Sequence, residues 1–410
     1  MTDGDGAARV APGTDRSVTK TGTTSKIGAL AGARGLPPLM IILYHFSEGH
    51  HYTGLLWFDR IAARGYLWVE FFFVLSGFIL AHAYGHRLKD LLQWRGYGAF
   101  LRARLIRLYP LHLFMLLLIL VLVIVFRALA AAGGYVSLYD LPWHQDVSAK
   151  GFALSLFLVQ AWHTMDRLTW NGLSWFVSVE FALCLLFPAL LYLSHGRAWR
   201  GVALIATGIA GLVALSFNSG HGLDITYDWG VARGVCDFII GIGMAVLFRE
   251  VKDQRIPVWV HTAIQVLLLL LLAYAVTYTG WAHTRNDILT VLPLIALIFA
   301  LAFDVGVLAR VMKTRIPQML GEWSYAIYLG QSTWLILLRF AKQRLYPPPD
   351  TIVLGIRFSD LMWGLEPLLL VIICVAWGGL LATFVEFPAA AKLRQWLGRR
   401  LDQPNVPTPS

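Results

Sequence analysis

The chain has 410 residues, of which 57% are hydrophobic and only 14% are charged. This composition excludes an ordinary soluble enzyme, in which about a quarter of the residues carry a charge, and it predicts an integral membrane protein. The net charge of +10 is typical of the cytoplasmic loops of such a protein and does not indicate a nucleic-acid partner.

The chain begins with a polar stretch, residues 1–26, that lacks hydrophobic periodicity. We expect a disordered cytoplasmic tail there, and no cleavable signal peptide, because the stretch has no apolar core. Residues 27–395 form the predicted all-α transmembrane domain, and residues 396–410 a second cytoplasmic tail. The three cysteines fall in apolar segments, so we expect free thiols.

Eleven apolar segments recur along the transmembrane domain, and ten of them are predicted to cross the membrane. They are residues 27–47, 66–84, 110–131, 151–163, 174–194, 201–217, 231–248, 258–279, 288–304, 320–340 and 366–387. The short segment 151–163 is expected not to cross. With both termini cytoplasmic, ten spans put 18 Lys and Arg residues in inner loops and 8 in outer loops, which agrees with the positive-inside rule.

The first segment carries two ionisable residues, Arg34 and His45. In one continuous helix they would lie about 16 Å apart along the axis and, three turns apart, on the same face. An ionisable group in hydrocarbon is costly unless it finds a partner or water. The pair therefore predicts a polar cavity, with Arg34 toward the cytoplasm and His45 deeper.

The second segment contributes Glu70 and Ser76. Ser76 is near mid-membrane and either lines the cavity or packs and bonds back to its own helix. Glu70 is explained most simply as an interfacial group solvated by water. The neighbouring run Phe71–Phe73 is expected to pack against lipid or other helices.

A basic run, Arg102, Arg104 and Arg107, precedes the third predicted span. Arg104 and Arg107 are three residues apart and share a helical face. Guanidinium groups bind phosphates through paired hydrogen bonds. The run is interpreted either as a phosphate-binding site or as an ordinary positive-inside anchor.

The segment 174–194 contains Trp175, Ser178 and Glu180. We expect Glu180 to reach a depth similar to that of His45, where a His–Glu pair would relieve the desolvation of both groups. Trp175 and Ser178 are candidates for the same cavity, although Trp175 also fits an interfacial aromatic and Glu180 a purely structural pair.

Later segments add further polar groups. Arg233 and Asp237 are one turn apart and are predicted to pair with each other, and Glu386 is interpreted as the end of the last span. A polar stripe at helical spacing would line a cavity or contact a neighbouring helix. Its members are Ser324, Tyr325, Tyr328 and Gln331. No spacing resembles a metal site or a nucleotide-binding loop.

Taken together, these motifs resemble the acyltransferase-3 family of polytopic membrane acyltransferases. The matching elements are Arg34 with His45, Phe72–Phe78, Arg102–Pro110, Ser174–Glu180, Ser324–Leu329 and Glu386–Pro388. Two departures stand out. Gln331 occupies a position where the family often has His, and Pro37 and Pro38 replace small apolar residues.

The resemblance implies a multi-pass enzyme of the bacterial inner membrane that transfers an acyl group, often acetyl, from cytoplasmic acyl-CoA to a hydroxyl group. It implies no permanently bound cofactor, a carbohydrate acceptor that includes lipid-linked units, and contact with membrane lipid. Arg34 and the run of Arg102, Arg104 and Arg107 would bind acyl-CoA.

In the same hypothesis, His45 is the general base or, as the less favoured alternative, carries the acyl group as a transient acyl-imidazole, and Glu180 orients its ring. Ser76, Trp175, Ser178, Arg233 and Tyr328 would line the cavity, with Ser76 and Tyr328 near the thioester. The alternatives are a transporter of an acyl donor or glycan intermediate, a membrane scaffold, and an acyltransferase with a macrolide-like acceptor. The sequence does not indicate the oligomeric state or the acyl chain length.

Overall fold

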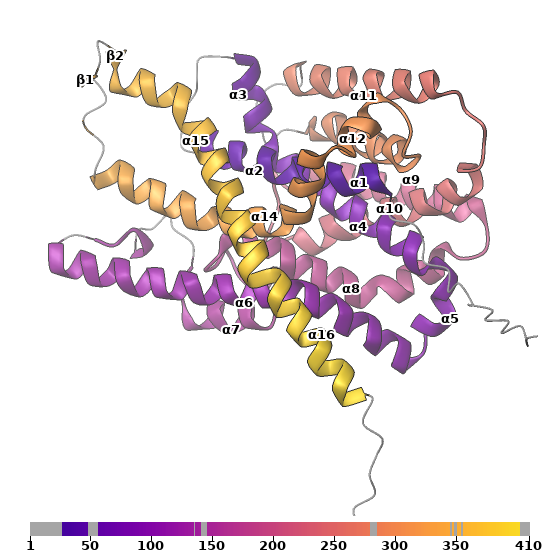
Figure 1. The fold of residues 1–410 in the computed structure, drawn as a ribbon, viewed down its shortest axis with the longest axis horizontal. Coiled ribbons are helices and arrows are strands. Elements are labelled where there is room, and N and C mark those ends of the chain that lie inside the picture. Colours follow the sequence, from indigo (N-terminus) through magenta and orange to yellow (C-terminus); the bar gives the residue numbers. More distant parts are fainter. Residues whose placement is uncertain are drawn as a thin grey trace, which may run out of the picture.

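The computed structural model describes residues 27–47, 56–134, 136–140, 146–278, 285–344, 347, 351–353 and 356–401. Within these residues the protein is a bundle of helices, to which a single short antiparallel hairpin is added, β1 (Ile352–Val353) with β2 (Ile356–Arg357) (Figure 1). The predicted tail 1–26 lies outside the described residues. Part of the second predicted tail is helical, because the last helix continues to Leu401.

The first half of the chain contains three long helices and several short ones. They are α1 (Gly28–Ala33), α2 (Leu36–Ser47), α3 (Leu56–Ala63), α4 (Trp68–Tyr84), α5 (Leu88–Leu91), α6 (Trp94–Gly133), α7 (Ala149–Leu156) and α8 (Trp175–Ser194). Short 3-10 turns η1 (Gly65–Leu67), η2 (Gly85–Arg87), η3 (Leu138–Asp140) and η4 (Gly172–Ser174) connect some of them.

The second half consists mostly of long apolar helices. They are α9 (Ala198–Asn218), α10 (Gly230–Val251), α11 (Val258–Tyr278), α12 (Asp287–Ala302), α13 (Val307–Met312), α14 (Arg315–Arg344), α15 (Phe358–Leu381) and α16 (Phe387–Leu401). A π-helical turn, η5 (Ala382–Glu386), joins the last two.

Seven helical stretches in the described part are long and apolar enough to cross a membrane, and α12 is a shorter apolar helix. All eleven predicted apolar segments contain helix. In the segment 151–163, helix α7 ends at Leu156 and turns follow. Its eight residues would span roughly 12 Å, less than the hydrocarbon core. The count of ten spans stays a prediction.

The first apolar segment is not one helix. It breaks between α1 and α2 at Arg34 and Gly35, and Pro37 and Pro38 occupy the first turn of α2, where a missing N–H does no harm. A Cβ on Gly35 would lie 2.5 Å from Cβ of Leu320 on α14. The same-face argument for Arg34 and His45 is therefore wrong, because the two residues belong to different helices.

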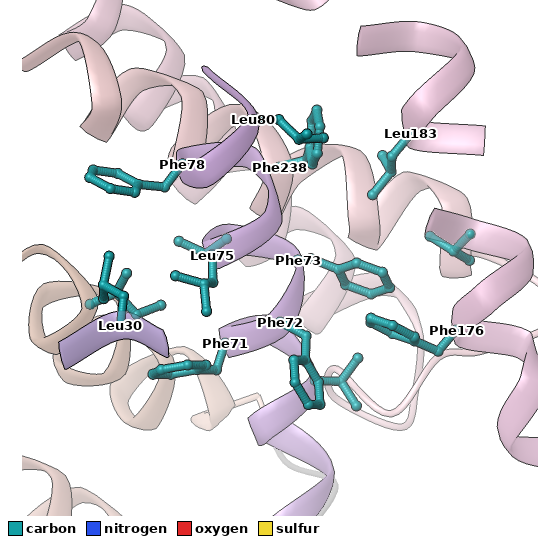
Figure 2. Close-up of a cluster of buried hydrophobic side chains, with 14 of the residues drawn as sticks. Leu30, Phe71, Phe72, Phe73, Leu75, Phe78, Leu80, Phe176, Leu183 and Phe238 are labelled. Atoms are coloured by element: carbon teal, nitrogen blue, oxygen red, sulfur yellow. The ribbon is translucent and has the colours of Figure 1, made fainter. Parts of the chain in front are cut away.

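The run Phe71–Phe73 packs against other helices and not against lipid. All three rings are buried in the cluster that surrounds α4 (Figure 2). Phe176 on α8 stacks on Phe73 with ring centroids 4.7 Å apart and meets Phe72 at 5.5 Å. These ring contacts connect α4 to α8.

A buried ion pair links α4 to α10. Both nitrogens of the Arg233 fork donate to the Glu70 carboxylate, Nε at 2.9 Å and Nη2 at 2.8 Å, and the guanidinium also donates to the carbonyl oxygens of Ile225 and Tyr66. Two predictions are therefore wrong. Glu70 is fully buried and not solvated, and Arg233 forms its hydrogen bonds with Glu70 and not with Asp237, whose oxygens have no hydrogen-bond partner.

We expect Glu70→Ala to destabilise the protein by about 3–5 kcal/mol, because it leaves the Arg233 guanidinium buried without its counter-ion. The matched control is Asp90→Ala, which breaks the exposed pair between Arg87 and Asp90 and should cost less than about 1 kcal/mol. Unfolding by SDS titration in mixed micelles measures the loss of unfolding free energy in each variant. Equal costs for the two variants would contradict the assigned role of the buried pair.

Candidate active site

A polar cavity lies where the break between α1 and α2 meets α4, α6, α8 and α14. Its small chamber has a volume of about 60 Å³. The polar and charged side chains in its wall are Arg34, Ser76, Arg104, Arg107, Glu180, Ser324, Tyr325 and Tyr328. Five elements far apart in the sequence therefore converge on this chamber.

A wider chamber adjoins the small one and has a volume of about 520 Å³. Arg34 and Arg107 line both chambers and so stand at the boundary between them. The wide chamber is also charged, since its wall contains Glu322, Glu386 and Arg394.

Glu180 forms an ion pair with Arg104. Nη2 of Arg104 donates to Oε1 of Glu180 at 2.5 Å, and both side chains are largely buried. The predicted pair between Glu180 and His45 is therefore wrong. The two helices that carry the pair, α6 and α8, are adjacent, so each charge neutralises the other at the point where both would otherwise be desolvated.

Arg34 and Arg107 differ from Arg104 in this respect. Neither guanidinium forms an ion pair or a side-chain hydrogen bond with any residue that the structure describes. Both are half-buried. Glu386 shares the wide chamber with these two arginines but makes no direct ion pair with either of them. Two guanidinium groups with free N–H donors, held at the junction of two chambers, form a site suited to an anion.

The small chamber also presents two hydroxyl groups. Ser76 is half-buried, and its hydroxyl has no hydrogen-bond partner among the described residues, so the expected back-bond is not formed there. The Tyr328 hydroxyl is fully buried and likewise unpartnered. Both groups are available to donate to a ligand in the chamber.

Several predicted site residues lie elsewhere. Arg102 is exposed and does not line either chamber. Trp175 and Arg233 contact each other, with the guanidinium carbon 5.6 Å from the indole centroid, outside the chamber wall. Ser178 is buried and binds the segment after α7, accepting from the N–H of Ala161 and donating to the carbonyl of Leu158.

His45 lies near the far end of α2 and is half-buried. Its ring is 5.1 Å from the ring of Tyr44, whose hydroxyl donates to Asp224 at 3.0 Å. His45 does not belong to the wall of the small or the wide chamber. Arg34 and His45 therefore serve different regions of the molecule, and the His45–Glu180 arrangement gives way to the Arg104–Glu180 pair.

Glu386 is a site residue whose role the sequence reading missed. The helix does not end there but passes through the π turn η5 into α16, and Glu386 is buried in the wall of the wide chamber. Pro388 is the sequence signal for this irregular turn, because it lacks the N–H that would continue regular α-helical hydrogen bonding. Such π turns are frequent at functional sites. The described residues hold no cluster suited to a metal ion.

The chain is similar to a known protein family and to two known proteins. The acyltransferase-3 family model, described as an acyltransferase domain, matches residues 27–385. The acyltransferase MdmB of Streptomyces mycarofaciens is 28% identical over 408 residues, covering 94% of this chain and 96% of that protein. Protein 2 in the picA locus of Rhizobium radiobacter is 36% identical over 156 residues, 38% of this chain and 73% of that protein.

No solved structure shows significant similarity to the chain. The apolar helices and the family match together show a multi-pass membrane protein. Because the family model covers most of the sequence, the chain belongs to the acyltransferase-3 family.

Proposed function

We propose that the protein is an acyl-CoA-dependent O-acyltransferase of the bacterial inner membrane, with both termini in the cytoplasm. It would transfer an acyl group such as acetyl to a hydroxyl group of a carbohydrate, such as a lipid-linked exopolysaccharide or O-antigen unit. The observation that carries the proposal is the pair of guanidinium groups, Arg34 and Arg107, which line both chambers and make no direct ion pair with a described residue.

The charge pattern supports a phosphate-bearing donor. A half-buried guanidinium without a hydrogen-bonded partner is unfavourable in a membrane protein, and a phosphate would accept paired hydrogen bonds from it. CoA carries several phosphates and a long flexible arm that ends in the thioester. The wide chamber has room for the charged part, and the small chamber suits a short acyl group.

The reaction would proceed in one transfer step. The acceptor oxygen attacks the thioester carbonyl carbon, the carbon–sulfur bond breaks, and an oxygen ester forms. The proton lost by the hydroxyl ends on the sulfur, so CoA leaves as the thiol. A hydroxyl donor such as Ser76 would stabilise the negative charge that develops on the carbonyl oxygen.

His45 remains our candidate for the general base, with its orientation set by groups other than Glu180. Glu180 then has a different role: it holds Arg104 in the chamber wall and keeps the local charge balanced. The relative MdmB is named only as an acyltransferase, so a macrolide-like acceptor stays the alternative to a carbohydrate.

The first test is acyl-CoA binding by arginine variants. We expect Arg34→Ala and Arg107→Ala each to raise the Kd for acetyl-CoA roughly 10- to 100-fold, the effect of losing a hydrogen-bonded charge contact of about 1.5–3 kcal/mol. Arg102→Ala is the matched control, because this exposed arginine lies on α6, the helix that carries Arg107, but outside both chambers. Its Kd should stay within twofold of wild type.

Calorimetric titration of the purified protein in detergent gives these constants, and transfer of labelled acetyl to endogenous membrane glycans shows whether chemistry occurs. An unchanged affinity in both Arg34→Ala and Arg107→Ala would refute the donor site. Binding without any acetyl transfer by the wild type would favour the transporter.

The second test concerns His45. We expect His45→Ala to lower the rate of acetyl transfer by about 10²- to 10⁴-fold, the usual effect of losing a general base, while the Kd for acetyl-CoA stays unchanged. His195→Ala, at an exposed histidine on the loop after α8, serves as the control and should transfer normally. Full activity of folded His45→Ala protein would exclude the role.

A further inference from the structure

One turn of α14, residues 328–331, is surrounded by buried polar atoms that have no partner. The hydroxyl of Tyr328, Oε1 of Gln331 and Oδ1 of Asn171 all lack a hydrogen bond, although these residues are at most 2% exposed. Buried polar atoms are nearly always satisfied, because an orphaned one weakens the fold. Three around a single turn therefore need an explanation.

The two amide groups are held in fixed positions by their donors. Nε2 of Gln331 donates to the carbonyl oxygen of Tyr328 at 3.0 Å, and Nδ2 of Asn171, next to η4, donates to the carbonyl oxygen of Leu329 at 3.4 Å. Each amide thus uses its nitrogen on the α14 backbone and leaves its oxygen open. These oxygens accept hydrogen bonds, whereas Tyr328 can donate one and accept one.

This turn begins in the wall of the small chamber and continues beyond it, since Gln331 and Asn171 do not line that chamber. Tyr328 lines that chamber, and Gln331 lies one turn further along the same face of α14. The ring of Tyr328 meets the rings of Phe176 and Phe72 at centroid distances of 5.3 and 6.1 Å, so apolar surface adjoins the polar atoms. The site thus offers two hydrogen-bond-accepting oxygens, one hydroxyl group and aromatic rings. These features suit a ligand that carries several hydroxyl groups on a ring with an apolar face.

The turn also lies at the level of His45. Gly35, just before α2, touches α14 at Leu320, and Ile42 and Phe46 of α2 cluster with Ile327 of α14. The two helices therefore run side by side. Counted from the contact between Gly35 and Leu320, His45 lies ten residues along α2 and Gln331 eleven residues along α14, about 15 Å in each helix.

We propose that Tyr328, Gln331 and Asn171 form the binding site for the hydroxyl-bearing acceptor, a carbohydrate, at the end of the small chamber away from the wide one. This inference rests on the proposed acyl transfer and adds the place of the second substrate. One acceptor hydroxyl accepts a hydrogen bond from Tyr328 and donates to Gln331, and a neighbouring hydroxyl donates to Asn171. Ser76 then remains the donor to the thioester carbonyl.

The test uses membrane vesicles that contain the full-length protein and its endogenous acceptor, supplied with radiolabelled acetyl-CoA. We expect Tyr328→Phe and Gln331→Met to lower the rate of alkali-labile acetyl incorporation into glycan about tenfold. The Kd of the purified variants for acetyl-CoA should stay within twofold of wild type. Ser332→Ala is the matched control: its buried hydroxyl on the same turn already donates to the carbonyl of Leu329, so it should incorporate acetyl normally.

Thermal unfolding separates binding from a structural role. Because Tyr328→Phe and Gln331→Met each remove an orphaned atom, their Tm should equal or exceed that of the wild type. Wild-type incorporation by both variants would overturn the inference, as would a parallel loss of acetyl-CoA affinity or a lowered Tm. If wild-type vesicles incorporate no acetyl while acetyl-CoA binds, the proposed transfer itself fails and the inference fails with it.

Discussion

The arrangement of this bundle depends on how its buried arginines are neutralised. A guanidinium cannot lose its charge, so inside a membrane protein it needs a carboxylate, carbonyl oxygens or a ligand. Arg233 obtains Glu70 together with two backbone carbonyls, and Arg104 obtains Glu180. These two pairs connect α4 to α10 and α6 to α8, and they leave Arg34 and Arg107 as the charges that the proposed donor would bind.

Close backbone contacts bring the unpaired charges together. Gly35 and Gly321 sit where α1, α2 and α14 touch, and a Cβ on Gly321 would collide with the backbone oxygen of Ala31. Small residues permit such approach between helices in a membrane. As a result Arg34, at the end of α1, faces the stripe of α14 that contains Ser324 and Tyr328, and the chamber closes around it.

The helices could be predicted from local sequence signals. The ion-pair partners that side chains find on other helices could not be predicted in this way. Runs of apolar residues mark every predicted helical segment, because hydrophobic length is read within one stretch of chain. The partner of Arg233 was predicted one turn away and lies on another helix. The same limit applies to Glu180, since equal depth in the membrane does not say which neighbouring helix faces it.

The Arg104–Glu180 pair also bears on where the proton goes in the proposed reaction. Oε1 of Glu180 already accepts a short hydrogen bond from Arg104, so this carboxylate serves to position a charge more readily than to take a proton. In the proposed reaction, Tyr328 and Gln331 would hold an acceptor hydroxyl at the level of His45, whose imidazole would take the proton. Charge binding at the junction of the two chambers and proton removal by His45, which lies outside both chamber walls, would then be handled by different residues.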